Sequence, residues 1–304
     1  MTGKVGFVGV GAMGGPMALN LVKAGFEVVV HDINPERVAP LAAAGARVVD
    51  TPAAAAAECR RTICMVETAE QAEAVILGGN GFVQKAQPRD IVICMSTIDP
   101  LLARRFAERL ADKRIAMLDA PVSGGPHGAA AGTLSVIVGG PEDTFAAAKD
   151  LFHAMGRNVF HVGGNGMGLA MKLINNMLGQ IQTVAIAEAM VLGRKAGLDP
   201  QKIYEVVSAS TGNSVQFQNR VPRILARNFK PGGTLDISFK DQELETAFAK
   251  RLGVPLFLAN VSQQVYQMGR AAGLSKEDGS SLVKVYERLA GVKISGDDSV
   301  PIEA

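Results

Sequence analysis

Residues 4–25 read KVGFVGVGAMGGPMALNLVKAG. A short β-rich run from Lys4 to Val8 leads into Gly9-Val10-Gly11-Ala12-Met13-Gly14, and a helical pattern follows. G-x-G-x-x-G between a strand and a helix is typical of a dinucleotide-binding turn. The first glycine permits the tight turn, the second lets backbone N–H groups approach the pyrophosphate, and the third lets the helix pack closely on the strand. We therefore expect Gly9, Gly11, Ala12, Met13 and Gly14 to bind a dinucleotide.

The next strand pattern ends at His31-Asp32, a little over twenty residues beyond the first glycine. A carboxylate at that position accepts hydrogen bonds from the adenosine ribose hydroxyls and repels a 2′-phosphate. Arg37 lies on the following helix, which we expect to be too far along to clamp such a phosphate. Asp32 therefore favours NAD over NADP, although an Asp followed by Asn34-Pro35 also fits a helix cap.

Strand and helix patterns then alternate through the first half of the chain. Strands are expected at residues 46–49, 61–66, 90–95, 114–118, 135–138 and 158–162, and helices at 69–77, 99–111 and 141–154, with another starting at 51. Repeated βα units of this length predict one parallel sheet covered on both faces. Ligands of such sheets lie beyond the carboxyl ends of the strands. The loops of interest are therefore 9–14, Asp32, Val66-Glu67, Ser96-Thr97 and 119–125.

The loop DAPVSGGPHG at residues 119–128 carries the densest signal of this half. Ser123-Gly124-Gly125 offers a hydroxyl and successive unhindered N–H groups, which suit a carboxylate. A tight strand-to-strand connection that needs glycine is the alternative interpretation. His127 is more typical of a solvent-facing residue or a cap than of an acid or base.

Residues 163–194 read GGNGMGLAMKLINNMLGQIQTVAIAEAMVLGR and predict one long helix that is buried on every face. Lys172 is the only formal charge between Arg157 and Glu188. It either extends its ammonium into water or lines a cleft, where desolvation disfavours the charged form and makes the amine a proton-transfer group. Asn176, one turn on, lies on the same helix face.

Beyond this helix the strand patterns nearly vanish. Helices are expected at residues 200–208, 214–226, 237–252, 255–271 and 276–289, and the tail from Gly296 is polar. Lys240-Asp241 is expected to open a helix. An exposed pair of this kind usually forms a solvated face, but its place after a Pro-Gly-Gly loop and an apolar run leaves a cleft position open. The prediction is an all-helical domain at 165–304 after an α/β domain at 1–164, joined through the long helix.

The composition bounds the possible functions. The chain has 304 residues, a net charge of +2 and three cysteines (Cys59, Cys64, Cys94) without metal-ligand spacing. Its thinly spread basic residues argue against a nucleic-acid surface, and its longest apolar run holds a lysine and several amides, which argues against a membrane span. Because the first residues enter a strand pattern at once, no signal peptide is expected. The sequence predicts a cytoplasmic protein without a metal site.

These motifs together resemble the β-hydroxyacid dehydrogenase family, the group of 3-hydroxyisobutyrate dehydrogenase, tartronate semialdehyde reductase and threonate dehydrogenase, related to 6-phosphogluconate dehydrogenase. The resemblance covers the whole chain. It depends on four motifs in the family's order: GFVGVGAMGGPMALNLVKAG, DAPVSGGPHGAAAGTL, GNGMGLAMKLINN and the Lys240-Asp241 segment. It implies a Rossmann domain with a doubly wound, mostly parallel sheet, a long interdomain helix and an all-α domain that forms homodimers or homotetramers.

The resemblance also implies roles for single residues. Lys172 is the general acid/base of hydride transfer between a small hydroxy acid and its oxo form, and Asn176 steadies the substrate. The other expected contacts are Ser123, Gly124, Gly125, Asn213, Ser214 and Lys240 with the substrate, and Val66, Glu67, Thr97 and again Lys240 with the cofactor.

The chain departs from the family at Val66-Glu67-Thr68, where many members carry Leu-Pro-Asp, and at Val215, where the threonate-type branch often has an aromatic residue. A 3-hydroxyisobutyrate-like acid and a threonate-like polyhydroxy acid therefore both stay open as substrates. Reduction of a semialdehyde or imine, with NADPH in place of NADH, is an alternative activity. A non-catalytic oligomeric binding protein is a remote alternative, because a scaffold has no need to keep a charge inside an apolar helix.

Overall fold

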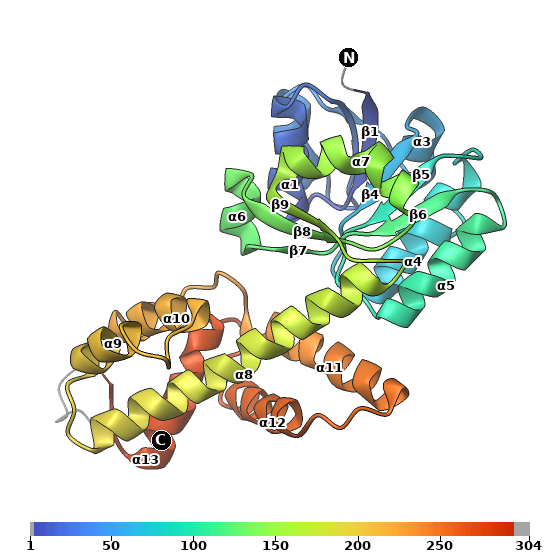
Figure 1. Cartoon of the computed structure of the whole chain (residues 1–304). Helices are drawn as coiled ribbons and strands as arrows, with labels where there is room; N and C mark the ends of the chain where they lie inside the picture. The colour runs from blue at the N-terminus through green and yellow to red at the C-terminus, as the bar shows by residue number, and fades with distance from the viewer. Residues whose placement is uncertain (1–2, 295–304) are drawn as a thin grey trace. The chain divides into compact units, whose positions relative to one another are not determined.

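The computed structural model describes residues 3–294 (Figure 1). The polar tail predicted from Gly296 lies outside the described residues. Contacts within the chain divide it into two compact units, Met1–Lys172 and Leu173–Ala304.

The first unit is built on a six-stranded parallel sheet in the order β3-β2-β1-β4-β5-β6. Its strands are β1 (Lys4–Val8), β2 (Glu27–His31), β3 (Arg47–Val48), β4 (Arg61–Cys64), β5 (Ile91–Cys94) and β6 (Ala116–Asp119). The connecting helices are α1 (Gly14–Lys23), α2 (Pro35–Ala43), α3 (Pro52–Glu58), α4 (Ala69–Leu77), the 3₁₀ turn η1 (Phe82–Gln84) and α5 (Pro100–Ala111).

Consecutive residues of a strand pack on opposite faces of this sheet. Val28 and Val30 join a core that includes α1 and a later helix, whereas Val29 between them joins a core with α3 and α5. Successive side chains of a strand point to opposite faces, so a strand of consecutive valines is expected in a sheet covered on both sides. The doubly wound arrangement predicted from the sequence is confirmed. Cys64 and Cys94, which are buried register partners in β4 and β5, belong to this core.

The expectation that the later strands complete the same sheet is wrong. β7 (Val122–Ser123), β8 (Leu134–Val138) and β9 (Gly156–His161) form a separate three-stranded sheet, joined to β6 by an isolated antiparallel bridge between Asp119 and Gly139. Since β7 runs antiparallel to β8, the turn at residues 119–123 redirects the chain out of the parallel sheet. The structure also has two helices here: α6 (Gly125–Ala131), which no sequence pattern predicted, and α7 (Glu142–Met155).

The second unit is helical. Its elements are α8 (Met167–Lys195, whose first residues belong to the first unit), α9 (Pro200–Ser208), α10 (Val215–Leu225), α11 (Leu235–Leu252), α12 (Phe257–Ala271), the 3₁₀ turn η2 (Gly279–Leu282) and α13 (Val283–Ala290). One core gathers the C-terminal half of α8 with α10 and α13, and another gathers Val184 of α8 with α11 and α12.

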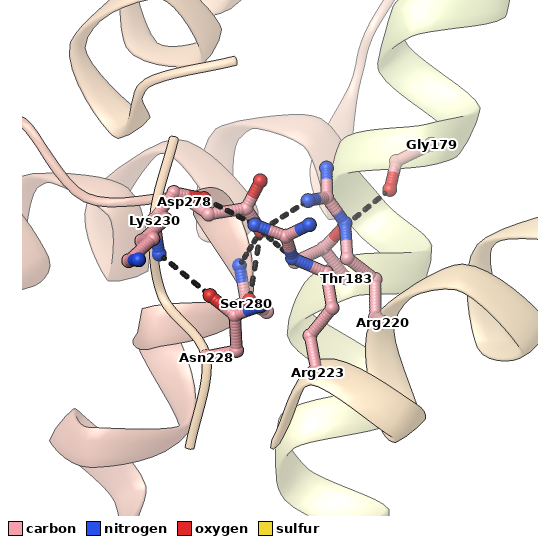
Figure 2. A network of polar contacts seen from close by, with 8 residues as sticks. All are labelled: Gly179, Thr183, Arg220, Arg223, Asn228, Lys230, Asp278 and Ser280. Carbon is pink, nitrogen blue, oxygen red and sulfur yellow. Dashed lines mark hydrogen bonds and ion pairs between the residues drawn. The ribbon is translucent and has the colours of Figure 1, made fainter. Parts of the chain in front are cut away.

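Two predictions about these helices are wrong. α8 is not buried on every face, since Ile174, Leu178 and Leu192 are exposed on it. The single helix expected at 276–289 is instead η2 followed by α13. Its start differs because the Asp278 side chain accepts from the backbone N–H of Ser280 and from Arg220 of α10, which holds a turn at this point. Figure 2 shows Arg220 and Arg223 of α10 pointing toward this carboxylate.

Candidate active site

The glycine-rich turn between β1 and α1 has the geometry that its sequence predicted. Gly9 has a φ of +89°, and a Cβ there would clash with the carbonyl oxygen of Met65. A Cβ on Gly14 would clash with the carbonyl oxygen of Gly9, so the first and third glycines are required by packing. At Gly11 the nearest atom to such a Cβ is Arg37 Nη1, at 3.6 Å, which leaves the backbone approachable.

The start of α1 suits an anion. No side chain caps its N-terminus, and its first turn holds no acidic residue. Helix N-termini attract negative charge through their backbone N–H groups. The open Gly11 and this helix start therefore fit the pyrophosphate of a dinucleotide.

Asp32 is fixed beside this turn. Its Oδ2 accepts from the backbone N–H of Val10 at 2.8 Å, and its Oδ1 accepts from the N–H of Asn34 at 2.9 Å. The cap of α2 is Asn34, whose Oδ1 accepts from the N–H of Glu36, so Asp32 does not cap that helix. Arg37 comes closer than expected, since its Nη1 lies 3.8 Å from Asp32 Oδ1.

The loop after β4 contacts both the glycine turn and the loop after β5. Val66 lies against Gly9, and its N–H donates to Ser96 Oγ at 2.8 Å. Thr97, the next residue after that serine, is half-buried, and Glu67 is exposed. Thr68, where many family members carry Asp, forms a capping box with Gln71 at the start of α4.

The Ser123-Gly124-Gly125 segment joins β7 to α6. Gly124 and Gly125 have φ values of +131° and +62°, a conformation that favours glycine. Ser123 pairs with Ser135 in the small sheet and is half-buried, whereas His127 is exposed, as its sequence context suggested.

Lys172 is buried in the structure. The residue is 8% exposed, although it lies on a helix with a partly exposed surface. This burial argues against a side chain that extends freely into water. It does not by itself assign the amine a reaction.

Asp119 begins the DAPVSGGPHG motif, and the structure gives it a specific position. It ends β6, is fully buried, and its carboxylate accepts from the backbone N–H groups of Gly166 at 2.7 Å and Leu169 at 2.9 Å. Burial raises the pKa of the Asp119 carboxyl even though these N–H groups favour the charged form. Its place at a strand end next to the glycine loop was the available signal. Its contacts with Gly166 and Leu169, 47 and 50 residues further along the chain, could not be predicted from the sequence.

In the helical unit, the side chains of Asn176 and Lys240 both contact the carboxylate of Asp241. Asn176 Nδ2 donates to Asp241 Oδ2 at 2.8 Å, and Lys240 Nζ lies 3.4 Å from Asp241 Oδ1. The pair does not open a helix, because α11 already begins at Leu235. Of the two interpretations left open for this pair, a fully solvated face does not fit, because the Asp241 side chain is buried and that of Lys240 is 36% exposed.

Asn213 and Ser214 lie in the turn between α9 and α10. Ser214 caps α10 by accepting from the N–H of Phe217 at 3.0 Å. Asn213 donates to the carbonyl oxygen of Ser208 and accepts from Gln218 Nε2 at 2.8 Å. Both side chains therefore hold the turn together.

Among the described residues, no three His, Cys, Asp or Glu side chains gather as a metal site. No helix within residues 3–294 is both long and apolar enough to cross a membrane.

Two family profiles match the chain. Residues 4–163 match the NAD binding domain of 6-phosphogluconate dehydrogenase, and residues 166–286 match a family described as NAD-binding of NADP-dependent 3-hydroxyisobutyrate dehydrogenase.

Individual relatives match over nearly the whole chain. L-threonate dehydrogenase of Cupriavidus necator is 36% identical over 297 residues, which cover 97% of this chain and 99% of that protein. Human mitochondrial 3-hydroxyisobutyrate dehydrogenase is 38% identical over 285 residues, 91% of this chain and 85% of that one. The solved structure of Mycobacterium tuberculosis 3-hydroxyisobutyrate dehydrogenase with L-serine superposes with a TM-score of 0.87 at 32% identity, covering 94% of this chain and 99% of that one.

The fold and these matches define an oxidoreductase with an NAD(P)-binding domain, a dehydrogenase that acts on CH–OH groups. The chain belongs to the β-hydroxyacid dehydrogenase family, as its motifs predicted.

Proposed function

We propose that this chain is an NAD-dependent dehydrogenase of a small hydroxy acid, with Lys172 as its general acid/base. The burial of Lys172 is the observation that carries the proposal. A lysine loses solvation when it is buried, which disfavours its ammonium form and makes a neutral amine available. The fixed glycine turn and the amide of Asn176, held by Asp241, support the same reaction.

Each of the expected site residues has its own role in the proposed reaction. Gly9, Gly11 and Gly14 would hold the pyrophosphate of the dinucleotide, whose nicotinamide supplies the hydride acceptor when it is bound. Lys172 Nζ takes the proton of the substrate hydroxyl during oxidation and returns it during reduction. Ser123, Gly124 and Gly125 bind the substrate carboxylate, and Asn176 orients the hydroxyl-bearing carbon.

The identity of the hydroxy acid is a further part of the proposal. The names of the relatives support a hydroxy acid, and they include both 3-hydroxyisobutyrate and L-threonate. A 3-hydroxyisobutyrate-like acid is the first candidate. A threonate-like acid is the second, because the threonate enzyme matches 97% of this chain.

A panel of hydroxy acids tests the reaction. Purified protein is mixed with NAD and, in separate assays, 3-hydroxyisobutyrate, L-threonate, glycerate or a simple secondary alcohol, and NADH absorbance is followed. We expect turnover with at least one of the acids and none with the alcohol, which has no carboxylate to bind. Reduction of a semialdehyde or imine by NADPH, without oxidation of any acid, would favour the alternative activity.

The preference for NAD is also a proposal. Asp32 is anchored by two backbone N–H groups, so its negative charge stays beside the turn where a 2′-phosphate would lie. Arg37 lies against the same carboxylate and supplies the opposite charge. We propose that Asp32 dominates, because its side chain is nearly buried while that of Arg37 is half exposed.

We further propose a homodimer or homotetramer. Phe257, Leu258 and Val261 are 79%, 70% and 63% exposed along α12, and Met268 continues the same surface of that helix. Contiguous exposed apolar surface is characteristic of an interaction site. The cytoplasmic location predicted from the sequence stays a prediction, and the three buried free cysteines are compatible with it.

A further inference from the structure

Asp119 holds the first turn of α8 from outside that helix. Its Oδ1 accepts from the N–H of Gly166 and its Oδ2 from the N–H of Leu169, so one carboxylate satisfies two donors at the helix start. Several helices of the first unit are instead capped by the residue just before their own first turn, such as Asn34 for α2 and Thr68 for α4.

The surrounding joint leaves the helix start little room to move. A Cβ on Gly168 would lie 2.5 Å from the carbonyl oxygen of Ile137 and 2.7 Å from that of Asp119. Asp119 and Gly139 exchange two backbone hydrogen bonds, at 3.0 and 2.8 Å. Asn165 Nδ2 adds a bond to the carbonyl oxygen of Met117 at 2.8 Å. The end of β6 and the start of α8 are therefore fixed to each other through both backbone and side chains.

This arrangement has an energetic cost. The Asp119 carboxyl is fully buried, and removing a charge from water costs free energy even when hydrogen bonds compensate part of it. A serine or threonine at the helix start would be a neutral cap and would satisfy these N–H groups without burying a charge. The buried carboxylate therefore indicates that the position of the helix start matters more here than the stability of the fold.

We propose that Asp119 is a positioning residue that fixes Lys172 through the first turn of α8. Lys172 follows Leu169 by three residues, roughly 4.5 Å along the helix axis, so a shift of the first turn moves the amine with it. The proposal rests on the proposed role of Lys172.

The test compares Asp119→Asn with Asp90→Asn. Asn keeps the shape but leaves one of the two N–H groups facing another donor. Asp90 is the matched control, because it is also buried and its Oδ2 accepts a backbone N–H, from Gln87 at 2.7 Å, at the start of β5. We expect Asp119→Asn to lower kcat about a hundredfold, with NAD affinity unchanged, since small misplacements of a reacting group cost about that much. Asp90→Asn should keep kcat at a similar loss of Tm.

A second variant keeps the test decisive if Asp119→Asn does not fold. Asn165→Ala removes only the neutral bond to Met117 at the same joint, and a roughly tenfold loss of kcat is expected as a smaller misplacement. In a Lys172→Ala background, Asp119→Asn should cause no further loss, because the two residues act as one unit. Wild-type kcat in the folded Asp119→Asn protein, or in Asn165→Ala where Asp119→Asn does not fold, would overturn the proposal. So would an independent loss in the double variant.

Failure of the proposed function is distinguishable from failure of this inference. An active Lys172→Ala enzyme would remove Lys172 from the reaction, and the positioning role would fall with it. An inactive Lys172→Ala enzyme beside a fully active Asp119→Asn enzyme would leave the reaction intact and reject only the positioning role.

Discussion

Asp32 and Arg37 lie 3.8 Å apart beside the glycine turn, and they favour different cofactors. The carboxylate suits the ribose hydroxyls of NAD, whereas the guanidinium suits the 2′-phosphate of NADP. The order of residues suggested that Arg37 is too distant to matter. In the structure Arg37 is close to Asp32, because it lies in the first turn of α2, directly after the loop that holds Asp32.

Replacing each of these residues separately distinguishes their effects on cofactor choice. Asp32→Asn should lower the NAD/NADP ratio of kcat/KM by about tenfold, the equivalent of one charge-assisted hydrogen bond. Arg37→Ala is the matched change and should reduce NADP use more than NAD use. Steady-state kinetics with both cofactors measures the ratios. An unchanged ratio in Asp32→Asn would mean that the carboxylate serves only the N–H groups of Val10 and Asn34.

At the scale of elements, the sequence predicted most helices and strands but not their partners. The glycine turn was predictable down to the role of each glycine, because local sterics decide it. α8 was expected to be buried all round. An apolar pattern does not reveal whether the same chain or another molecule covers a face, and Ile174 and Leu178 are exposed. The contact of Asp119 with α8 depends on tertiary packing, which leaves no local pattern.

The replacement of a predicted helix start by η2 leads to a prediction about acid stability. Burial disfavours the Asp278 carboxylate, but Arg220, the Ser280 backbone and hydroxyl, and Arg223 outweigh burial and lower the pKa of Asp278 (Figure 2). A folded-state pKa below the unfolded value of about 3.9 stabilises the protein above that pH, and the contribution is lost as pH falls through the folded pKa.

Asp278→Asn should therefore cost about 3 kcal/mol at neutral pH, because it breaks a buried ion pair. The difference from wild type should shrink as the pH falls below about 4. Urea unfolding at several pH values measures both effects. Asp236→Asn is the control, since its ion pairs with Arg270 and Lys276 are more exposed and are expected to contribute less than about 1 kcal/mol. A deficit in Asp278→Asn that is independent of pH would contradict this account.

At the scale of the whole molecule, the exposed apolar surface of α12 is a feature that a single chain leaves unexplained. Phe257→Asp combined with Val261→Asp should reduce the mass in solution to that of a smaller assembly, because each introduced charge would have to be desolvated in the interface. Light scattering coupled to size exclusion measures the mass.

Leu289→Asp is the matched control for this pair of changes. Leu289 is also exposed and apolar, but it lies on α13 and not on α12. Its mass should equal that of the wild type. A monomeric wild type, or an unchanged mass in the double variant, would contradict an interface at α12.

The role of Lys172 is the central claim, and the turnover of Lys172→Ala tests it most directly. With NAD and the best acid from the panel, kcat should fall by about a hundredfold to ten-thousandfold, the usual contribution of general acid–base catalysis, while NAD affinity and Tm stay near wild type. Lys195→Ala, an exposed lysine at the end of the same helix, should keep full activity. A Lys172→Ala enzyme that retains wild-type kcat would contradict the account.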